Sequence, residues 1–189
     1  RYDMPCSEFE LGLKKEVTER LIGLGLPSAE DCIVVSIDQQ KLWHIQGLQC
    51  ETYVVSTARA GRGCVQDSQQ TPDGLHQICE KIGAGATPGM VFKARQPTGK
   101  LASEWATPED NLITSRILWL DGLEPGRNQG TAPDGSAVDT RRRFVYIHGT
   151  NQSDKLGQPN SHGCVLLADA DVIRLFDAVA VGTKVLIKD

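Results

Sequence analysis

A histidine and a cysteine near the carboxyl end of the chain have the residue types needed for nucleophilic catalysis. The apolar run 144–147 predicts a strand that ends at His148, and the polar loop 151–160 would bring Cys164 back beside it. A cysteine attacks as its thiolate, which a neighbouring histidine can generate or stabilise. The N–H groups of Gly163 and Cys164 could then point at a developing oxyanion. This arrangement predicts acyl transfer through a thioester.

Residue types alone leave two other interpretations of this segment open. A buried cysteine is often only a small apolar side chain, and a lone histidine only a hydrogen-bonded polar group. His148, His162 and Cys164 could also bind zinc, although no acidic or cysteine side chain supplies an obvious fourth ligand. A catalytic thiol predicts fast alkylation with an apparent pKa below the ~8.5 of free cysteine. A structural thiol predicts slow alkylation, and a zinc protein predicts bound metal.

The rest of the chain predicts short strands behind one N-terminal helix. Ser7 and Glu10 have the spacing of a capping box, and the apolar pattern after them predicts a helix over 8–24. Strands are predicted at 32–37, 41–45, 51–56, 117–120, 144–147 and 184–188, and a second helix behind Asp169. The stretch 58–114 is rich in glycine, proline and polar residues, so it predicts irregular binding or lid loops.

Length and composition limit the domain organisation and the partners. The 189 residues are 40% hydrophobic and 23% charged, which suits one soluble domain. The formal charge of -4 offers no global positive field for nucleic acid, and no apolar run reaches the ~18 residues of a membrane span. The run Arg141, Arg142 and Arg143 is a local exception and predicts a solvated strand start. We expect an N-terminal helical extension at 1–28 and a catalytic domain at 29–189.

The segment that carries the chemistry resembles the signature of the L,D-transpeptidase catalytic domain of the YkuD type. It consists of His148-Gly149-Thr150 and Ser161-His162-Gly163-Cys164, with 12 residues between His148 and Ser161. The resemblance continues through the segments 35–42, 55–57, 71–74, 116–120 and 171–183. It covers about residues 32–187 in the order of the family and leaves out the N-terminal helix.

The resemblance implies a mainly β fold with α-helices, similar to a β-sandwich, in which Cys164 is the nucleophile and His148 the general base. By similarity, the carbonyl of Gly149 orients the His148 ring, while Ser161, His162 and Gly163 shape the substrate and oxyanion site. Such enzymes need no metal or cofactor. Their thiolate attacks the bond between an L-centre and a terminal D-residue of a peptidoglycan stem peptide, normally meso-diaminopimelate to D-alanine, and releases the D-residue.

The acyl group then passes to an amine, which gives 3-3 cross-links or related products, and carbapenem-type β-lactams acylate the same cysteine. This function implies roles in peptidoglycan biosynthesis, cell-wall organisation and cell shape. It also implies export to the periplasm or cell envelope by a signal peptide absent from this sequence. Six cysteines fit an oxidising compartment, but they allow 15 pairings and the sequence selects none.

Leu166 departs from the family pattern, because arginine or asparagine usually stands two positions after the cysteine. A guanidinium there could bind a carboxylate through a bidentate ion pair, which leucine cannot form. Lys93, Arg95 and Arg142 are the candidates for a replacement contact. The departure keeps a non-catalytic peptidoglycan-binding module open as an alternative. An L,D-carboxypeptidase, which passes the same thioester to water, is the alternative within enzymes.

Overall fold

The structure is a computed structural model that describes residues 4–189. Residues 1–3 of the expected N-terminal extension lie outside the described residues. The helices are α1 (Glu8–Gly23) and α2 (Asp169–Ala178), with single turns of 3-10 helix at Ala102–Glu104 and Ser153–Lys155. The strands are β1 (Asp31–Ser36), β2 (Lys41–Gln46), β3 (Gln49–Val54), β4 (Gly74–Ile82), β5 (Met90–Lys93), β6 (Gln96–Leu101), β7 (Ile113–Gly122), β8 (Tyr146–Gly149), β9 (Val165–Leu167) and β10 (Lys184–Lys188).

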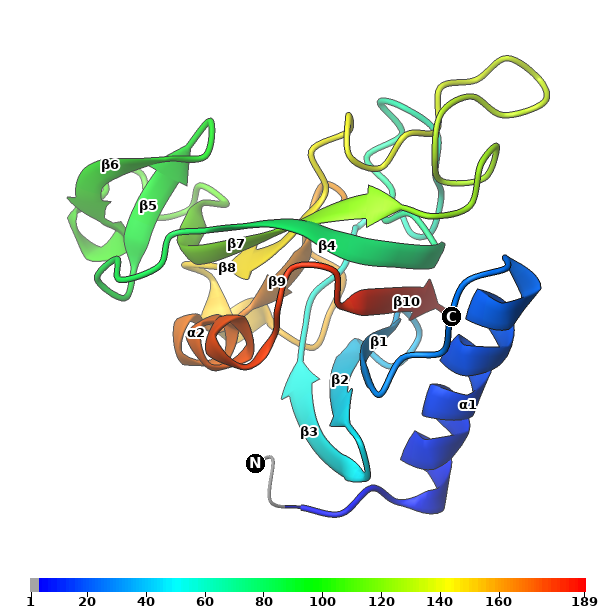
Figure 1. Cartoon of the computed structure of the whole chain (residues 1–189). Coiled ribbons are helices and arrows are strands. Elements are labelled where there is room, and N and C mark those ends of the chain that lie inside the picture. Colours follow the sequence, from blue (N-terminus) through cyan, green and yellow to red (C-terminus); the bar gives the residue numbers. More distant parts are fainter. Residues whose placement is uncertain (1–3) are drawn as a thin grey trace.

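All ten of these strands belong to one hydrogen-bonded sheet, so the predicted mainly β fold with helices is confirmed. Its main path runs β3-β2-β1-β10-β4-β7-β5-β6, and β8 and β9 branch from β7. Strands β1, β2 and β3 form the predicted consecutive antiparallel hairpins, whereas β1 pairs with β10 in parallel. The sheet curls so strongly that β1–β3 lie below β4 and β7 in Figure 1. The curl encloses a core rather than leaving two flat faces.

The main core fills the concave side of the sheet. Apolar side chains of eight strands meet α2 there, through its buried residues Val172, Leu175 and Phe176. Apolar positions recur along α2 at helical spacing, which explains why one side of this short helix is buried. The opposite face of β7, β8 and β9 therefore remains available for a site.

Helix α1 covers a different part of the sheet, where it packs against β1, β2 and β4 (Figure 1). The predicted capping box is confirmed, because Ser7 Oγ accepts from the Glu10 N–H while Glu10 accepts from the Ser7 N–H. Leu13, Val17 and Leu21 are buried against the sheet. Burying each such side chain stabilises the fold by about 1.5–3 kcal/mol. The helix therefore packs on its own chain.

The prediction of irregular loops throughout 58–114 is wrong for about a third of that stretch. It contains β4 in the middle of the sheet and the hairpin of β5 and β6. Strand β4 pairs with both β10 and β7, and a bulge lies between Ile78 and Glu80. These partners are far away in sequence, so tertiary pairing overrides the weak local propensity of Gly74–Ile82.

Candidate active site

Two short parallel strands position the histidine and the cysteine. Strand β8 pairs with β9 so that His148 stands opposite Leu166 and Ile147 opposite Val165. Cys164 comes immediately before β9, and the Tyr146 N–H donates to Cys164 Sγ over 3.3 Å. Strand β8 begins two residues later than predicted, because Phe144 adopts a left-handed φ of 55° in the preceding turn. His148 therefore lies inside the strand and not after it.

The His148 ring is held by the backbone of the next residue. Its Nδ1 lies 2.6 Å from the carbonyl oxygen of Gly149, which assigns the ring hydrogen to Nδ1 and leaves Nε2 as the acceptor. The ring also contacts Tyr146 edge to face, with 6.5 Å between the centroids. This arrangement is the one that the resemblance implies for the Gly149 carbonyl.

Gly149 has no room for a side chain. A Cβ at this position would lie 2.5 Å from the Thr114 carbonyl oxygen, 2.7 Å from Thr114 Oγ1 and 2.9 Å from Asp169 Oδ1. Thr114 Oγ1 and Ser115 Oγ both donate to the same Asp169 oxygen, so the neighbours are fixed in a buried polar cluster. The strand must carry glycine here to keep its place beside β7.

We predict that Gly149→Ala lowers the free energy of unfolding by roughly 1–3 kcal/mol, because overpacking displaces β8 from β7. Urea denaturation of the variant and the parent protein measures the difference. Gly12→Ala is the matched control, because a Cβ on Gly12 in α1 meets nothing within 4 Å. Alanine is the better helix former, so the control should be neutral or slightly stabilising. Equal stability of Gly149→Ala and the parent would contradict the packing argument.

The turn before the cysteine is tied together by Ser161. Ser161 Oγ donates to the Cys164 carbonyl oxygen over 2.6 Å and accepts from the Gly163 N–H over 3.1 Å. Gly163 adopts a φ of 133°, which side chains disfavour, and Thr71 Oγ1 donates to its carbonyl oxygen over 3.0 Å. Because the Gly163 N–H already binds Ser161, it is not free to receive an oxyanion in this structure.

The predicted site residues gather around one small pocket of about 180 Å³. Its lining residues are Asn111, Ile113, His148, Ser161, His162, Cys164 and Leu166. His162 is exposed at the pocket and Leu166 is almost fully buried in its wall. Within residues 4–189, no group of three or more His, Cys, Asp and Glu side chains could hold a metal ion. The six cysteines of the chain, all within that range, are free thiols.

Sequence reasoning missed Asn111 and Tyr146 as residues of this site. Asn111 donates from Nδ2 to the Asn160 carbonyl oxygen over 3.1 Å, whereas its buried Oδ1 has no hydrogen-bond partner in the structure. Asn111 lies in the polar stretch before β7, and only the pairing of β7 with β8 brings it to the cysteine. No local pattern in the sequence marks such a residue.

Burial keeps both members of the pair neutral. Desolvation lowers the pKa of His148 to about 4, against the smaller opposing effect of its hydrogen bond with Gly149. Desolvation also raises the pKa of Cys164 to about 11, although the Tyr146 N–H and the positive charge of Arg143 favour the thiolate. Burial thus favours the neutral thiol in the resting protein, in contrast to the pKa below ~8.5 that the sequence predicts for a catalytic thiol, and the alkylation experiment below decides between the two.

Arg143 supports the loop that borders this turn. It donates to the Gln70 carbonyl oxygen over 2.7 Å and to the Gly63 carbonyl oxygen over 3.3 Å. The predicted solvated face of the arginine run is found for Arg141 and Arg142, which are exposed, but not for the half-buried Arg143. The left-handed backbone of Phe144 lies between Arg143, which points inward, and the start of β8.

We predict that alkylation of Cys164 by iodoacetamide accelerates about tenfold per pH unit from pH 7 towards pH 11, because only the thiolate reacts. Mass spectrometry of the peptide that contains Cys164 follows this one thiol among six. The exposed thiol of free cysteine, treated in parallel, should level off near pH 8.5. A plateau for Cys164 at or below that pH would show a preformed thiolate and contradict the effect of burial.

Comparison with known proteins shows the family. The family model "L,D-transpeptidase catalytic domain" (YkuD) matches residues 30–187. The putative L,D-transpeptidase YqjB of Bacillus subtilis is 42% identical over 71 residues, which cover 37% of this chain and 40% of that protein. The probable L,D-transpeptidase YbiS of Escherichia coli is 49% identical over 43 residues, or 23% of this chain and 14% of that protein. The chain thus matches less than half the length of either relative.

A solved structure shares the fold. L,D-transpeptidase 3 from Mycobacterium tuberculosis, in complex with a faropenem-derived adduct, superposes with a TM-score of 0.52 at 16% identity. The superposition covers 87% of this chain and 62% of that one. The family model matches residues 30–187, and the paired strands β8 and β9 bring together His148 and Cys164 of the motif. This chain belongs to the YkuD family of L,D-transpeptidase catalytic domains.

Proposed function

We propose that the protein is a cysteine-dependent L,D-transpeptidase that acts on peptidoglycan stem peptides, with Cys164 as nucleophile and His148 as general base. The observation that supports this most directly is the shared pocket of about 180 Å³, into which both residues and His162 are brought from different segments. The Nδ1 contact with Gly149 leaves His148 Nε2 as the proton acceptor. A neutral imidazole is the form that a general base requires.

In the first half-reaction, the thiol proton passes from Cys164 Sγ to His148 Nε2 while Sγ attacks the carbonyl carbon of the L-centre. The tetrahedral oxyanion accepts a hydrogen bond from the backbone N–H of Cys164, because the Gly163 N–H donates to Ser161 in this structure. The carbon–nitrogen bond then breaks, and the proton on His148 goes to the leaving amine of the D-residue. This leaves a thioester on Cys164 and a neutral histidine.

In the second half-reaction, an amine of an acceptor stem attacks the thioester and gives its proton to His148. The new amide bond forms as the carbon–sulfur bond breaks, and the proton returns to the sulfur. Because the resting pair is neutral, charge develops only when substrate fills the pocket and excludes water.

Product analysis tests this function. The protein and a Cys164→Ala control are incubated with disaccharide-tetrapeptide that carries meso-diaminopimelate and D-alanine. The products are then identified by mass spectrometry. We expect a cross-linked dimer from the parent protein alone. Tripeptide without dimer would establish the carboxypeptidase. If both proteins leave the tetrapeptide intact but bind it, the binding module suggested by Leu166 is correct.

Two further parts of the proposal concern inhibitors and location. We propose that carbapenem-type β-lactams acylate Cys164, and that the protein works in the periplasm or cell envelope in cell-wall organisation and cell shape. The faropenem-derived adduct of the Mycobacterium tuberculosis structure, which comes from a penem, a β-lactam class related to the carbapenems, supports the first part. Among residues 4–189, neither α-helix has the length and apolar character needed to span a membrane.

A further inference from the structure

The sheet face that carries the cysteine continues across three strands. Glu80 of β4 stands opposite Trp119 of β7, and Trp119 stands opposite Tyr146 of β8. Residues directly opposite one another point to the same side of a sheet, so these three side chains share a face. Tyr146 also donates its N–H to Cys164 Sγ. A row of side chains therefore leads from the nucleophile to Glu80.

Arg95 reaches this row from the turn between β5 and β6. Its guanidinium lies over the Trp119 ring at 4.9 Å and over the Phe144 ring at 5.1 Å from the centroids, and it donates to Tyr146 Oη over 3.1 Å. These contacts hold the planar group in one orientation. Arg95 thus projects over β7 and β8, roughly 5–10 Å from β9 at the usual strand spacing.

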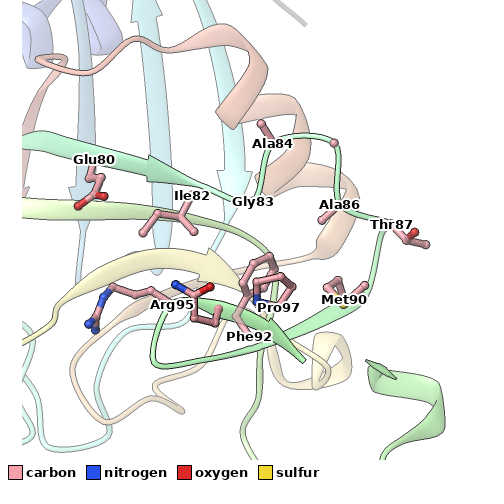
Figure 2. A pocket seen from close by; sticks show the side chains of 12 residues that line it. Glu80, Ile82, Gly83, Ala84, Ala86, Thr87, Met90, Phe92, Arg95 and Pro97 are labelled. Carbon is pink, nitrogen blue, oxygen red and sulfur yellow. The ribbon is translucent and has the colours of Figure 1, made fainter. Parts of the chain in front are cut away.

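A pocket of about 670 Å³ lies beneath the hairpin at this end of the face. Figure 2 shows Glu80 and Arg95 together at one end and Ala86 and Met90 at the other. Ile82, from the same strand as Glu80, contributes an apolar wall. One end of the pocket is charged with both signs, and the rest is mainly apolar.

The charges at that end have free binding capacity. Arg95 forms no ion pair with a carboxylate anywhere in residues 4–189, and the bond to Tyr146 uses one of its five N–H donors. Glu80 is exposed and lines the same pocket. A ligand group with a carboxylate and an ammonium on one carbon would complement both side chains.

We propose that the pocket between Arg95 and Glu80 binds the amino-acid end of the diaminopimelate side chain of the donor stem, with Arg95 on its carboxylate and Glu80 on its ammonium. This deepens the proposed function and rests on it. The side chain of diaminopimelate places that end five bonds from the carbonyl carbon under attack, which suits the separation of Arg95 from β9. Arg95 thereby supplies the carboxylate contact that Leu166 cannot make.

The other two candidates for that contact lie elsewhere. Lys93 is exposed on the hairpin, with its Nζ 5.2 Å from the Trp105 ring centroid. Arg142 is exposed in the turn before β8, where its N–H binds Asp139. Of the three, only Arg95 contacts a residue that binds the cysteine.

Binding to the Cys164→Ala protein tests the site without turnover. Calorimetry compares two disaccharide-tetrapeptides, one with the free side-chain carboxylate of meso-diaminopimelate and one with that carboxylate converted to its amide. We expect the acid to bind about tenfold more tightly, because a charge-assisted, partly exposed contact is lost in the amide. Adding Arg95→Gln should remove this preference, and Arg95→Lys should keep part of it. Lys93→Gln, on the same hairpin, should leave the preference intact.

The role of Glu80 is tested by comparing peptides with a free and an acetylated side-chain amine. N-acetylation of the side-chain amine should weaken binding to Cys164→Ala severalfold, and adding Glu80→Gln should remove this difference. Equal Kd values for acid and amide, a preference that survives Arg95→Gln, or no measurable binding of either peptide would overturn the proposal. Acylation of the parent protein by a carbapenem, measured by intact-protein mass spectrometry, tests Cys164 separately. If carbapenem acylates Cys164 but the acid and amide peptides bind equally, only the proposed subsite is refuted. If the acid peptide binds more tightly but the protein shows neither acylation nor turnover, only the proposed chemistry is refuted.

Discussion

Cys164→Ala should abolish both turnover of the tetrapeptide and formation of a covalent carbapenem adduct. Loss of a nucleophile commonly lowers kcat by roughly 10⁴-fold or more, because no other group can form the covalent intermediate. Cys164→Ser tests the same point with a smaller change, since a hydroxyl is a much weaker nucleophile at neutral pH. Intact-protein mass spectrometry measures the adduct, and product mass measures turnover.

Cys6→Ser is the matched control for this prediction. Cys6 is half-buried and packs in the cluster beneath α1, on the part of the sheet remote from the pocket. Its turnover should equal that of the parent protein. If Cys164→Ala still forms an adduct, or keeps more than a hundredth of the activity, Cys164 is not the nucleophile and the acyl-transfer mechanism is wrong.

His148→Gln should lower the rate of carbapenem acylation by roughly 10²–10⁴-fold at pH 7, with little change in folding. Glutamine keeps a polar group beside the Gly149 carbonyl but cannot take the proton from a thiol whose pKa burial raises to about 11. Acylation of the variant should therefore rise steeply with pH, since hydroxide supplies the missing base. Stopped-flow or mass-based acylation rates between pH 6 and 10 measure both effects.

The pH profile of the parent protein provides the contrast. The pKa of His148 lies near 4, so its base form is present across this range and can take the thiol proton once the β-lactam occupies the pocket. Acylation should therefore change much less with pH than in the variant, unlike the reaction with iodoacetamide, which does not occupy the pocket as a substrate does. His162→Gln is the comparison variant, because His162 also lines the pocket; it should keep the shape of the parent pH profile even where its rate is lower. Identical pH profiles for His148→Gln and the parent would show that His148 is not the general base.

Local patterns predicted the elements that depend on neighbouring residues. The capping box of Ser7 and Glu10 marks the start of α1, and the closing strand 184–188 appears as β10 with the same bounds. Both follow from interactions or alternation within a few residues. The stretch Gly74–Ile82 offered no such signal, because it is a strand through its pairing with β10 and β7. Its structure is a long-range property of the sheet.

The residues proposed to carry the chemistry could be identified from the sequence, because the motif spacing from His148 to Cys164 is a local property of the chain. Their protonation states could not, since the pKa values follow from burial that the whole fold creates. Arg143 turned inward and Arg95 placed over Tyr146 are likewise products of tertiary packing. A short sequence pattern names the reacting groups, but only contacts between distant segments set their charge, their access to water and the shape of the pocket around them.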